Sequence, residues 1–202
     1  MLKVAALIIG IDGWEQYTLP LISSIRLYEP SCEVVVIDNA SVKPYPGLPC
    51  VHRTERLCYA GAINVASAFA GECDWYIVLS NDVLCNGPFV EFLSKTPSNN
   101  LVGPCLKKIE DKIPYLEGWC VAASGLVWRT MGGWDANFKV SSWEDVDFSL
   151  TAIKCGFNLA YAPSFPFVHL DQKQRFTLIP DYWASEDHNI RYFAKKHGLV
   201  AA

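Results

Sequence analysis

Short apolar runs alternate along this chain with segments of helical spacing. Continuous β-branched or apolar runs, which are typical of strands buried on both faces, are expected as strands at 3–9, 33–38, 50–53, 74–80, 101–105, 158–161 and 165–169. Helices are expected at 14–28, 59–70, 87–94, 143–156 and 180–197, and 119–128 fits a strand or a short helix. The alternation predicts a single α/β domain with a Rossmann-like, mostly parallel central sheet flanked by helices.

Composition narrows the classes of function. The 202 residues suffice for one domain with a sizeable core, and the net charge of −4 gives no basic face for nucleic acid. No apolar run reaches the roughly 18 residues of a membrane span. The apolar start breaks at Asp12 without a cleavage site, which favours a first strand over a signal peptide. Eight cysteines without a C-x-x-C pair are expected as reduced thiols of a cytoplasmic protein.

Polar residues follow three of the expected strands. They are Ile11-Asp12 after the first strand, Asp38-Asn39 after the second, and Ser80-Asn81-Asp82 after the strand at 74–80. Parallel strands would bring these ends to one sheet edge, where such sheets bind ligands, although Asp and Asn are also common turn residues. Neither G-x-G-x-x-G nor G-x-x-x-x-G-K-[ST] occurs, which argues against dinucleotide dehydrogenases and P-loop proteins.

The stretch WEDVDFSL (143–150) concentrates three carboxylates at a helix start. Ser142 and Asp145 have the spacing of a capping box, and acidic residues suit the positive end of the helix dipole. A helical wheel places Glu144 opposite the expected buried stripe, with Asp145 and Asp147 flanking it on opposite sides. That stripe consists of Val146, Leu150, Ile153 and Phe157. At most one of the two aspartates is therefore expected to serve a site as a base.

Five segments in order resemble the inverting glycosyltransferases of family 2, which have the GT-A fold. The segments are VVVIDNAS, RLCYAGAIN, YIVLSNDV, GGWDANF and WEDVDFSL, and the resemblance runs from Val4 to about His169. It implies an enzyme that moves a sugar from a nucleotide-diphosphate sugar to an acceptor hydroxyl. It also implies a nucleotide-sugar-binding half (1–85) and an acceptor and catalytic half (86–170). The residues themselves predict a closing C-terminal helix after these halves (171–202).

The resemblance implies a donor site along the first half. Asp38 would contact the nucleobase, and Gly61 and Asn64 match the family's donor segment. Arg56 and Cys58 depart from that segment, so that Arg56 is either a charge near the diphosphate or a surface arginine. The strand-end residues Ile11, Asp12 and Asn81 complete the expected donor contacts.

The resemblance also implies a metal and a base. Ser80-Asn81-Asp82 stands at the D-x-D element, so Asp82 would hold Mn²⁺ or Mg²⁺, with His169 either joining it or serving as a core residue. Asp145 would be the general base and Glu144 would orient the acceptor, while Asp147 would be structural. Trp134 and Trp143, and also Trp119 and Trp128, are either acceptor-stacking or core residues.

The expected acceptor is a saccharide, a protein or a modified nucleobase, and no membrane-docked lipid acceptor is implied. A non-catalytic nucleotide-sugar-binding scaffold is the alternative, because Ser80, Arg56 and Cys58 depart from the family pattern. A nucleotidyltransferase is disfavoured, since the loop Gly10-Ile11-Asp12-Gly13 holds no basic residue.

Overall fold

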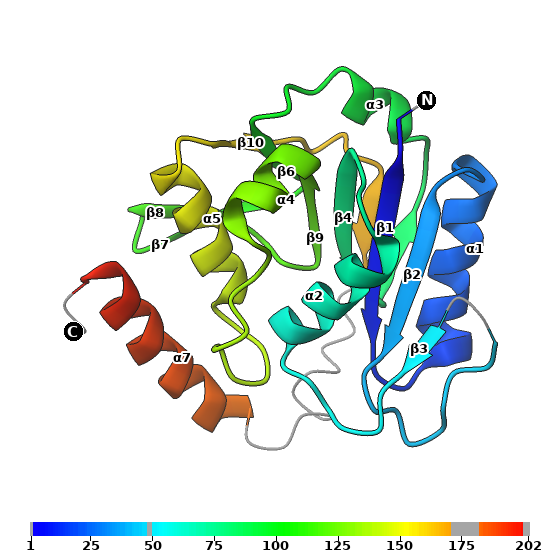
Figure 1. Cartoon of the computed structure of the whole chain (residues 1–202), viewed down its shortest axis with the longest axis horizontal. Coiled ribbons are helices and arrows are strands. Elements are labelled where there is room, and N and C mark those ends of the chain that lie inside the picture. The colour runs from blue at the N-terminus through cyan, green and yellow to red at the C-terminus, as the bar shows by residue number, and fades with distance from the viewer. Residues whose placement is uncertain (1, 48–49, 171–181, 200–202) are drawn as a thin grey trace.

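The fold was analysed in a computed structural model that describes residues 2–47, 50–170 and 182–199. A seven-stranded sheet forms its centre, in the order β10-β6-β9-β4-β1-β2-β3 (Figure 1). The strands are β1 (Val4–Gly10), β2 (Glu33–Asp38), β3 (Cys50–His52), β4 (Trp75–Ser80), β6 (Asn100–Gly103), β9 (Cys120–Ser124) and β10 (Asn158–Tyr161). Strand β9 runs antiparallel to β4 and β6, and the other neighbouring pairs are parallel. The predicted α/β class with a mostly parallel sheet is confirmed.

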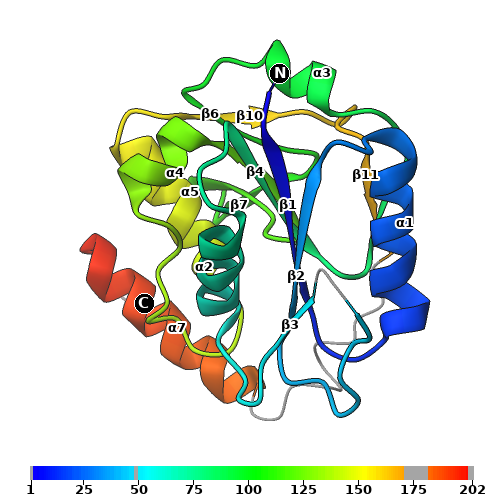
Figure 2. The same ribbon diagram turned by 45° about the vertical axis from the view of Figure 1, so that its right-hand side comes forward.

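Helices cover both faces of the sheet (Figures 1 and 2). Side chains of β1 alternate between two apolar clusters, because successive residues of a strand point to opposite faces. One cluster includes residues of α1 (Leu19–Tyr28), which follows a π-helical turn at Trp14–Thr18, and of α3 (Val90–Ser94). The other includes residues of α2 (Tyr59–Ala70), α4 (Gly125–Met131) and α5 (Glu144–Lys154). The sheet is thus packed between two apolar cores, one on each face.

Two pieces of the fold were left open or missed by the sequence patterns. The undecided segment 119–128 is a strand followed by a helix, since β9 leads into α4, where Ser124 Oγ accepts the N–H of Val127 at 3.2 Å. The missed strands are β5 (Val83–Cys85), which pairs with β11 (Phe167–His169), and the hairpin of β7 (Leu106–Ile109) and β8 (Ile113–Leu116). Strands of three or four residues are too short to show a period.

Helix α7 (Tyr182–His197) is fastened to α5 by a charged contact at its C-terminal end. The Asp147 carboxylate lies 2.8 Å from both Lys196 Nζ and His197 Nε2. Residues 171–181, including the start of the helix expected at 180, lie outside the described part of the chain. None of the helices described combines the length and apolarity that a membrane crossing requires.

The start of α5 differs from its expected form. Ser142 makes no cap: its hydroxyl lies 3.4 Å from Glu186 Oε1, and Trp143 precedes the helix with φ 72°. The single buried stripe is also wrong, since Ile153 is 38% exposed while Glu144 is only 5% exposed. The cause is that α5 is covered on more than one side: its Phe148 lies in the sheet-facing core, whereas Val146 belongs to a separate cluster.

Candidate active site

The polar strand ends meet at one edge of the sheet, as predicted. Gly10 pairs with Asp38, and Ile9 pairs with Ser80, so β1, β2 and β4 end level with one another. The antiparallel β9 begins at this same edge, because the Ser80 N–H donates to the Trp119 carbonyl at 3.1 Å. Residues just before β9 therefore join the site.

Asp82 and His169 lie together at this edge. The β5–β11 pairing sets Val83 opposite His169, and His169 Nε2 lies 3.3 Å from Asp82 Oδ1. Ser80 Oγ donates to the same carboxylate oxygen at 2.7 Å. Burial alone would raise the pKa of Asp82, but the hydrogen bonds from His169 and Ser80 outweigh it and lower the pKa. The carboxylate is thus held ionised, as a cation ligand must be.

This pair suits a divalent cation that binds together with a diphosphate. Within the described ranges, no group of three or more His, Cys, Asp or Glu side chains could hold a metal ion. Two protein ligands nevertheless fit Mg²⁺ or Mn²⁺, because such ions keep several waters and take oxygens from substrate phosphates. The partial burial of Asp82 and the imidazole nitrogen beside it are consistent with that use.

Asp145 is oriented by the backbone in front of β9. Its Oδ2 accepts the N–H of Gly118 at 2.8 Å, and its Oδ1 accepts the N–H of Val146 at 2.9 Å. Burial raises the pKa of Asp145 despite these hydrogen bonds. A carboxylate with a raised pKa is a stronger base than an ordinary aspartate.

Glu144 is buried beside Asp145, which corrects the expectation that it faces outward. One oxygen, Oε1, lies 3.4 Å from Ser141 Oγ, and the other has no hydrogen-bond partner among the described residues. Burial first, and then the charge of Asp145, raise the pKa of Glu144 to about 7. Near neutral pH the side chain can therefore carry a proton and donate a hydrogen bond.

The phenol of Tyr59 is close both to Asp82 and to the two carboxylates at the start of α5, Glu144 and Asp145. Its hydroxyl donates to the Gly118 carbonyl at 3.1 Å. The pKa of Tyr59 is raised well above its ordinary value by burial and by the nearby charges of Glu144, Asp82 and Asp145. All three carboxylates thus lie within electrostatic range of one phenol. Sequence reasoning did not select Tyr59, although it stands inside the donor segment that begins at Arg56.

Asp38 supports the loop after β2 instead of presenting an open carboxylate. Its two oxygens accept the backbone N–H groups of Ser41 at 3.0 Å and Tyr45 at 2.9 Å, and His52 Nδ1 lies at 2.7 Å. Burial would raise the pKa of Asp38, but these hydrogen bonds lower it. The side chain is fully buried, so the expected nucleobase contact stays a prediction.

Hydrogen bonds tie the remaining donor-side residues together. The Asp12 N–H donates to Ser41 Oγ at 2.7 Å, and the Asn81 amide donates to Thr18 Oγ1 at 3.2 Å. The Tyr45 hydroxyl donates to the Asp12 carbonyl at 2.5 Å. Ile11 is half-buried at the same edge, whereas Arg56 is exposed on the segment before α2. The loops after β1, β2 and β4 are therefore one connected rim.

Asn64 and Trp134 are hydrogen-bonded to each other, and the donor contact expected of Asn64 and the acceptor contact expected of Trp134 stay predictions. The Asn64 amide donates to the Trp134 carbonyl at 2.7 Å and accepts the Trp134 N–H at 2.9 Å, so both of its groups are used. Trp134 is 3% exposed and stacks on Phe148 with centroids 4.8 Å apart. Gly61 donates its N–H to the sulfur of Cys58 at 3.3 Å, which caps α2.

The other tryptophans have different surroundings. Trp143 directly precedes α5, is half-buried, and has its ring 5.2 Å from that of Phe193 on α7. Trp128 is buried against Tyr76, with ring centroids 4.7 Å apart, and is a core residue.

Replacing Asn64 by Ala is expected to lower the free energy of unfolding by about 2 kcal/mol, because the N–H and carbonyl of Trp134 both lose their partner. Urea unfolding measures this. Asn99→Ala, at an exposed asparagine, is the matched control. An unchanged stability with weakened donor binding would instead support the donor contact expected of Asn64.

Glu144→Gln is expected to remove a pH dependence of stability. The folded-state pKa of about 7 exceeds the ordinary 4.5, so the folded protein binds more protons between these values and loses stability as the pH rises through them. The variant should be more stable than the parent at pH 8, by a few kcal/mol at most, and similar at pH 4.5. Urea unfolding at both pH values, with exposed Glu72→Gln as control, measures the difference. Parallel pH curves for both proteins would contradict the assignment.

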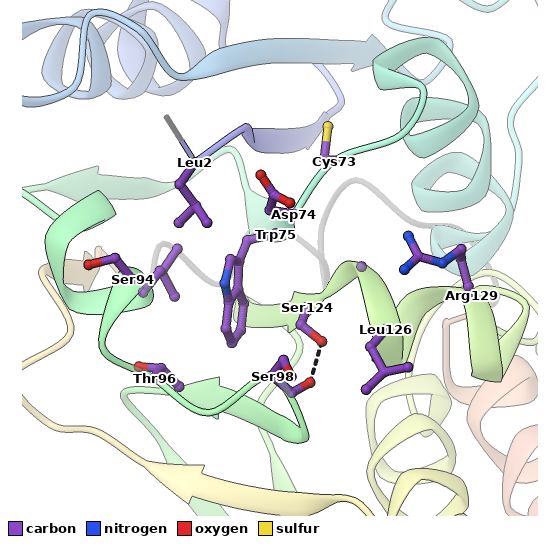
Figure 3. Close-up of a pocket in the computed structure, with 12 residues that line it drawn as sticks. Leu2, Cys73, Asp74, Trp75, Ser94, Thr96, Ser98, Ser124, Leu126 and Arg129 are labelled. Atoms are coloured by element: carbon purple, nitrogen blue, oxygen red, sulfur yellow. Dashed lines mark hydrogen bonds between the residues drawn. The ribbon is translucent and has the colours of Figure 1, made fainter.

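A hollow of about 390 Å³ lies at the opposite, amino edge of the sheet. Figure 3 shows Asp74 and Trp75 from the start of β4 facing Ser124, Leu126 and Arg129 around it. It shares no residue with the Asp82 and Asp145 groups, so it is separate from the candidate site.

Comparison with protein-family models and with curated proteins found no match. Solved structures do match. GalNAc-T7 with UDP, GalNAc and Mn²⁺ aligns with a TM-score of 0.69 at 14% identity, over 84% of this chain and 44% of its own. The mannosyltransferase PcManGT from Pyrobaculum calidifontis, with GDP-Man and Mn²⁺, aligns at 0.72 and 19% identity, over 100% and 66%. This chain has the GT-A glycosyltransferase fold.

A third structure agrees with this fold. The catalytic domain of Drosophila beta1,4-galactosyltransferase 7, in complex with xylobiose, aligns with a TM-score of 0.59 at 18% identity, over 88% of this chain and 73% of its own. The chain spans less than half of the GalNAc-T7 chain and about two thirds of PcManGT. At these identities the likeness concerns the fold, which confirms the GT-A architecture expected from the sequence.

Proposed function

We propose that this protein is a glycosyltransferase of the family 2 kind, moving a sugar from a nucleotide-diphosphate sugar to an acceptor hydroxyl with inversion. The observation that carries the proposal is that Asp82 with His169, and Asp145 with Glu144, adjoin one short segment at the carboxyl edge of the sheet. Gly118 of this segment is hydrogen-bonded to Asp145 and to Tyr59, and the Trp119 carbonyl accepts the N–H of Ser80, whose hydroxyl binds Asp82. Support also comes from solved structures of the same fold, which are complexes with UDP or GDP-Man together with Mn²⁺.

In this proposal, Asp82 and His169 bind the metal ion that stabilises the leaving group. Asp82 and His169 would hold Mn²⁺ or Mg²⁺, which when bound stabilises the negative charge that grows on the diphosphate. The rim formed by Ile11, Asp12 and Asn81 lies at the same edge and would bind the donor, with Asp38 beneath it. Arg56 would add positive charge near the diphosphate.

Asp145 is the proposed general base. It takes the proton of the acceptor hydroxyl as that oxygen bonds to C1 of the sugar, while the bond from C1 to the diphosphate oxygen breaks on the opposite face. Its raised pKa and its fixed hydrogen bond to Gly118 suit this role. Glu144 would orient the acceptor, as the resemblance implies, and Trp143 would contribute to the acceptor side.

The alternative is a scaffold that binds a nucleotide-sugar without catalysis. It has one observation in its favour: Ser80, at the first D-x-D position, supplies a hydroxyl that is already bonded to Asp82. The expected acceptors remain a saccharide, a protein or a modified nucleobase. The cytoplasmic location expected for the chain is likewise part of this proposal and accords with its eight free thiols.

Calorimetry with UDP-, GDP- and dTDP-sugars, each with and without Mn²⁺, tests the proposal first. The expected result is Mn²⁺-dependent binding of one donor class, followed by release of the nucleotide diphosphate when saccharide, protein or nucleoside acceptors are added. The anomeric configuration of the product, read by NMR, tests inversion. Metal-dependent binding with neither hydrolysis nor transfer would favour the scaffold.

A further inference from the structure

The Trp119 ring lies flat on the imidazole of His169. The ring centroids are 4.9 Å apart and the planes differ by 4°. Trp119 immediately precedes β9 and is only half-buried, so a core-packing role does not account for all of its surface. The imidazole thus has the indole on one face and Asp82 at its Nε2 edge.

Glu117 holds the indole in this position. Trp119 Nε1 donates to Glu117 Oε2 at 3.1 Å, and the other Glu117 oxygen pairs with Lys107 of β7. Burial would raise the pKa of Glu117, but hydrogen bonds with Cys105, Lys107 and Trp119 lower it, which keeps the carboxylate ionised. The Trp119 carbonyl also accepts the Ser80 N–H. The indole is therefore fixed through both its side chain and its backbone.

We propose that Trp119, held by Glu117, is a positioning residue for His169, and that it keeps Nε2 directed toward Asp82 for cation binding. The inference rests on the metal site of the proposed function. The imidazole torsion is intrinsically broad, so a flat neighbour that restricts it reduces the entropy lost when a cation binds. A ligated imidazole also gains positive charge, which the face of an indole favours.

The same segment reaches the candidate base. Gly118, between the two residues, donates its N–H to Asp145 and accepts from Tyr59. Residues 117–119 therefore contact the metal pair on one side and the carboxylate of α5 on the other. Their placement follows from the antiparallel direction of β9, which brings its start to the carboxyl edge.

The test is Mn²⁺ affinity, measured by electron paramagnetic resonance on the full-length protein with and without UDP or GDP. Partners of metal ligands are typically worth about 10–100-fold in affinity, and Trp119→Leu is expected to lose an amount in that range. Trp119→Phe keeps a flat ring and should stay close to the parent protein. Glu117→Gln should lie between them, because it keeps a hydrogen-bond acceptor but loses the pairing with Lys107. Trp183→Leu, at a tryptophan that is 68% exposed, is the matched control.

A double-mutant cycle separates positioning from packing. In a His169→Ala background, Trp119→Leu should cause no further loss of Mn²⁺ affinity, since the group it positions is gone. An equal loss in both backgrounds, or Trp119→Leu binding Mn²⁺ as tightly as the parent, would overturn the inference. A parent protein that binds Mn²⁺ but transfers no sugar would overturn the proposed function alone, whereas a parent without Mn²⁺ affinity would overturn both.

Discussion

Asp145→Asn is expected to lower kcat for glycosyl transfer by about 10²–10⁴-fold, the usual contribution of a general base, while donor and Mn²⁺ still bind. The amide cannot take the acceptor's proton. Its oxygen can still accept a hydrogen bond from Gly118 or Val146, so the local geometry should survive. For the unaltered protein, the rate should fall as the pH drops through the raised pKa of Asp145, above the range of an ordinary aspartate.

Single-turnover rates at saturating donor and Mn²⁺, together with thermal melting, measure this effect. Asp147→Asn is the matched control, because it removes a carboxylate from the same helix two residues further along. Asp147 binds Lys196 and His197 of α7, so its loss should lower the melting temperature while the folded fraction retains transfer. If Asp145→Asn kept most of the parental rate, or if Asp147→Asn were the inactive variant, the assignment of the base would be wrong.

Local patterns were sufficient for the elements with a clear period. The β-branched run at 33–38 and the small-residue helix at 59–70 occur with those bounds. Among the strands of three or four residues, β3, β6, β10 and β11 were expected, whereas β5, β7 and β8 were missed. Strand β5 pairs with β11, which is more than 80 positions away along the chain. The segment 119–128 was undecidable for a related reason: a strand and a helix follow each other within it, and neither is long enough to dominate the pattern.

The rule that ligands bind at the carboxyl ends of parallel strands placed Asp12, Asn81 and Asp82 at one edge. It could not find Glu117 or Gly118, because they precede a strand whose antiparallel direction is set by its neighbours β4 and β6. Trp119 was expected as either an acceptor contact or a core residue, and its stacking on His169 depends on that same direction.

For Asn64 and Glu144, the sequence patterns could not include contacts that only the folded chain makes. Asn64 matches a donor motif, but its side-chain NH₂ and carbonyl groups both form hydrogen bonds with the backbone of Trp134. These two residues are 70 positions apart in the sequence. Glu144 was placed outward because a helical wheel assumes one buried face, whereas α5 contributes to two separate apolar clusters.

Asp82→Asn is expected to abolish Mn²⁺-dependent donor binding, with a loss of at least about 100-fold in affinity, since even partners of metal ligands cost about 10–100-fold. The substitution removes the carboxylate of the pair and leaves the His169 imidazole as the other proposed ligand. Neutral amide oxygens bind divalent cations more weakly than carboxylates do, because the electrostatic attraction is smaller. Calorimetry with the nucleotide diphosphate, with and without Mn²⁺, reads the loss directly and without any acceptor.

Asp74→Asn is the matched control for this variant, because it removes the same charge at the other end of β4, on the exposed amino edge. The control should keep parental Mn²⁺ and nucleotide affinity. The two variants then separate the two steps of the proposed reaction. Asp145→Asn should bind the donor but fail to transfer the sugar, whereas Asp82→Asn should fail to bind the donor. A scaffold would lose binding in Asp82→Asn but show no transfer in the parent for Asp145→Asn to lose. If Asp82→Asn kept the metal-dependent binding of the parent, the cation would not be bound by Asp82 and His169. The proposed link between a metal site at Asp82 and a base at Asp145 would then be wrong.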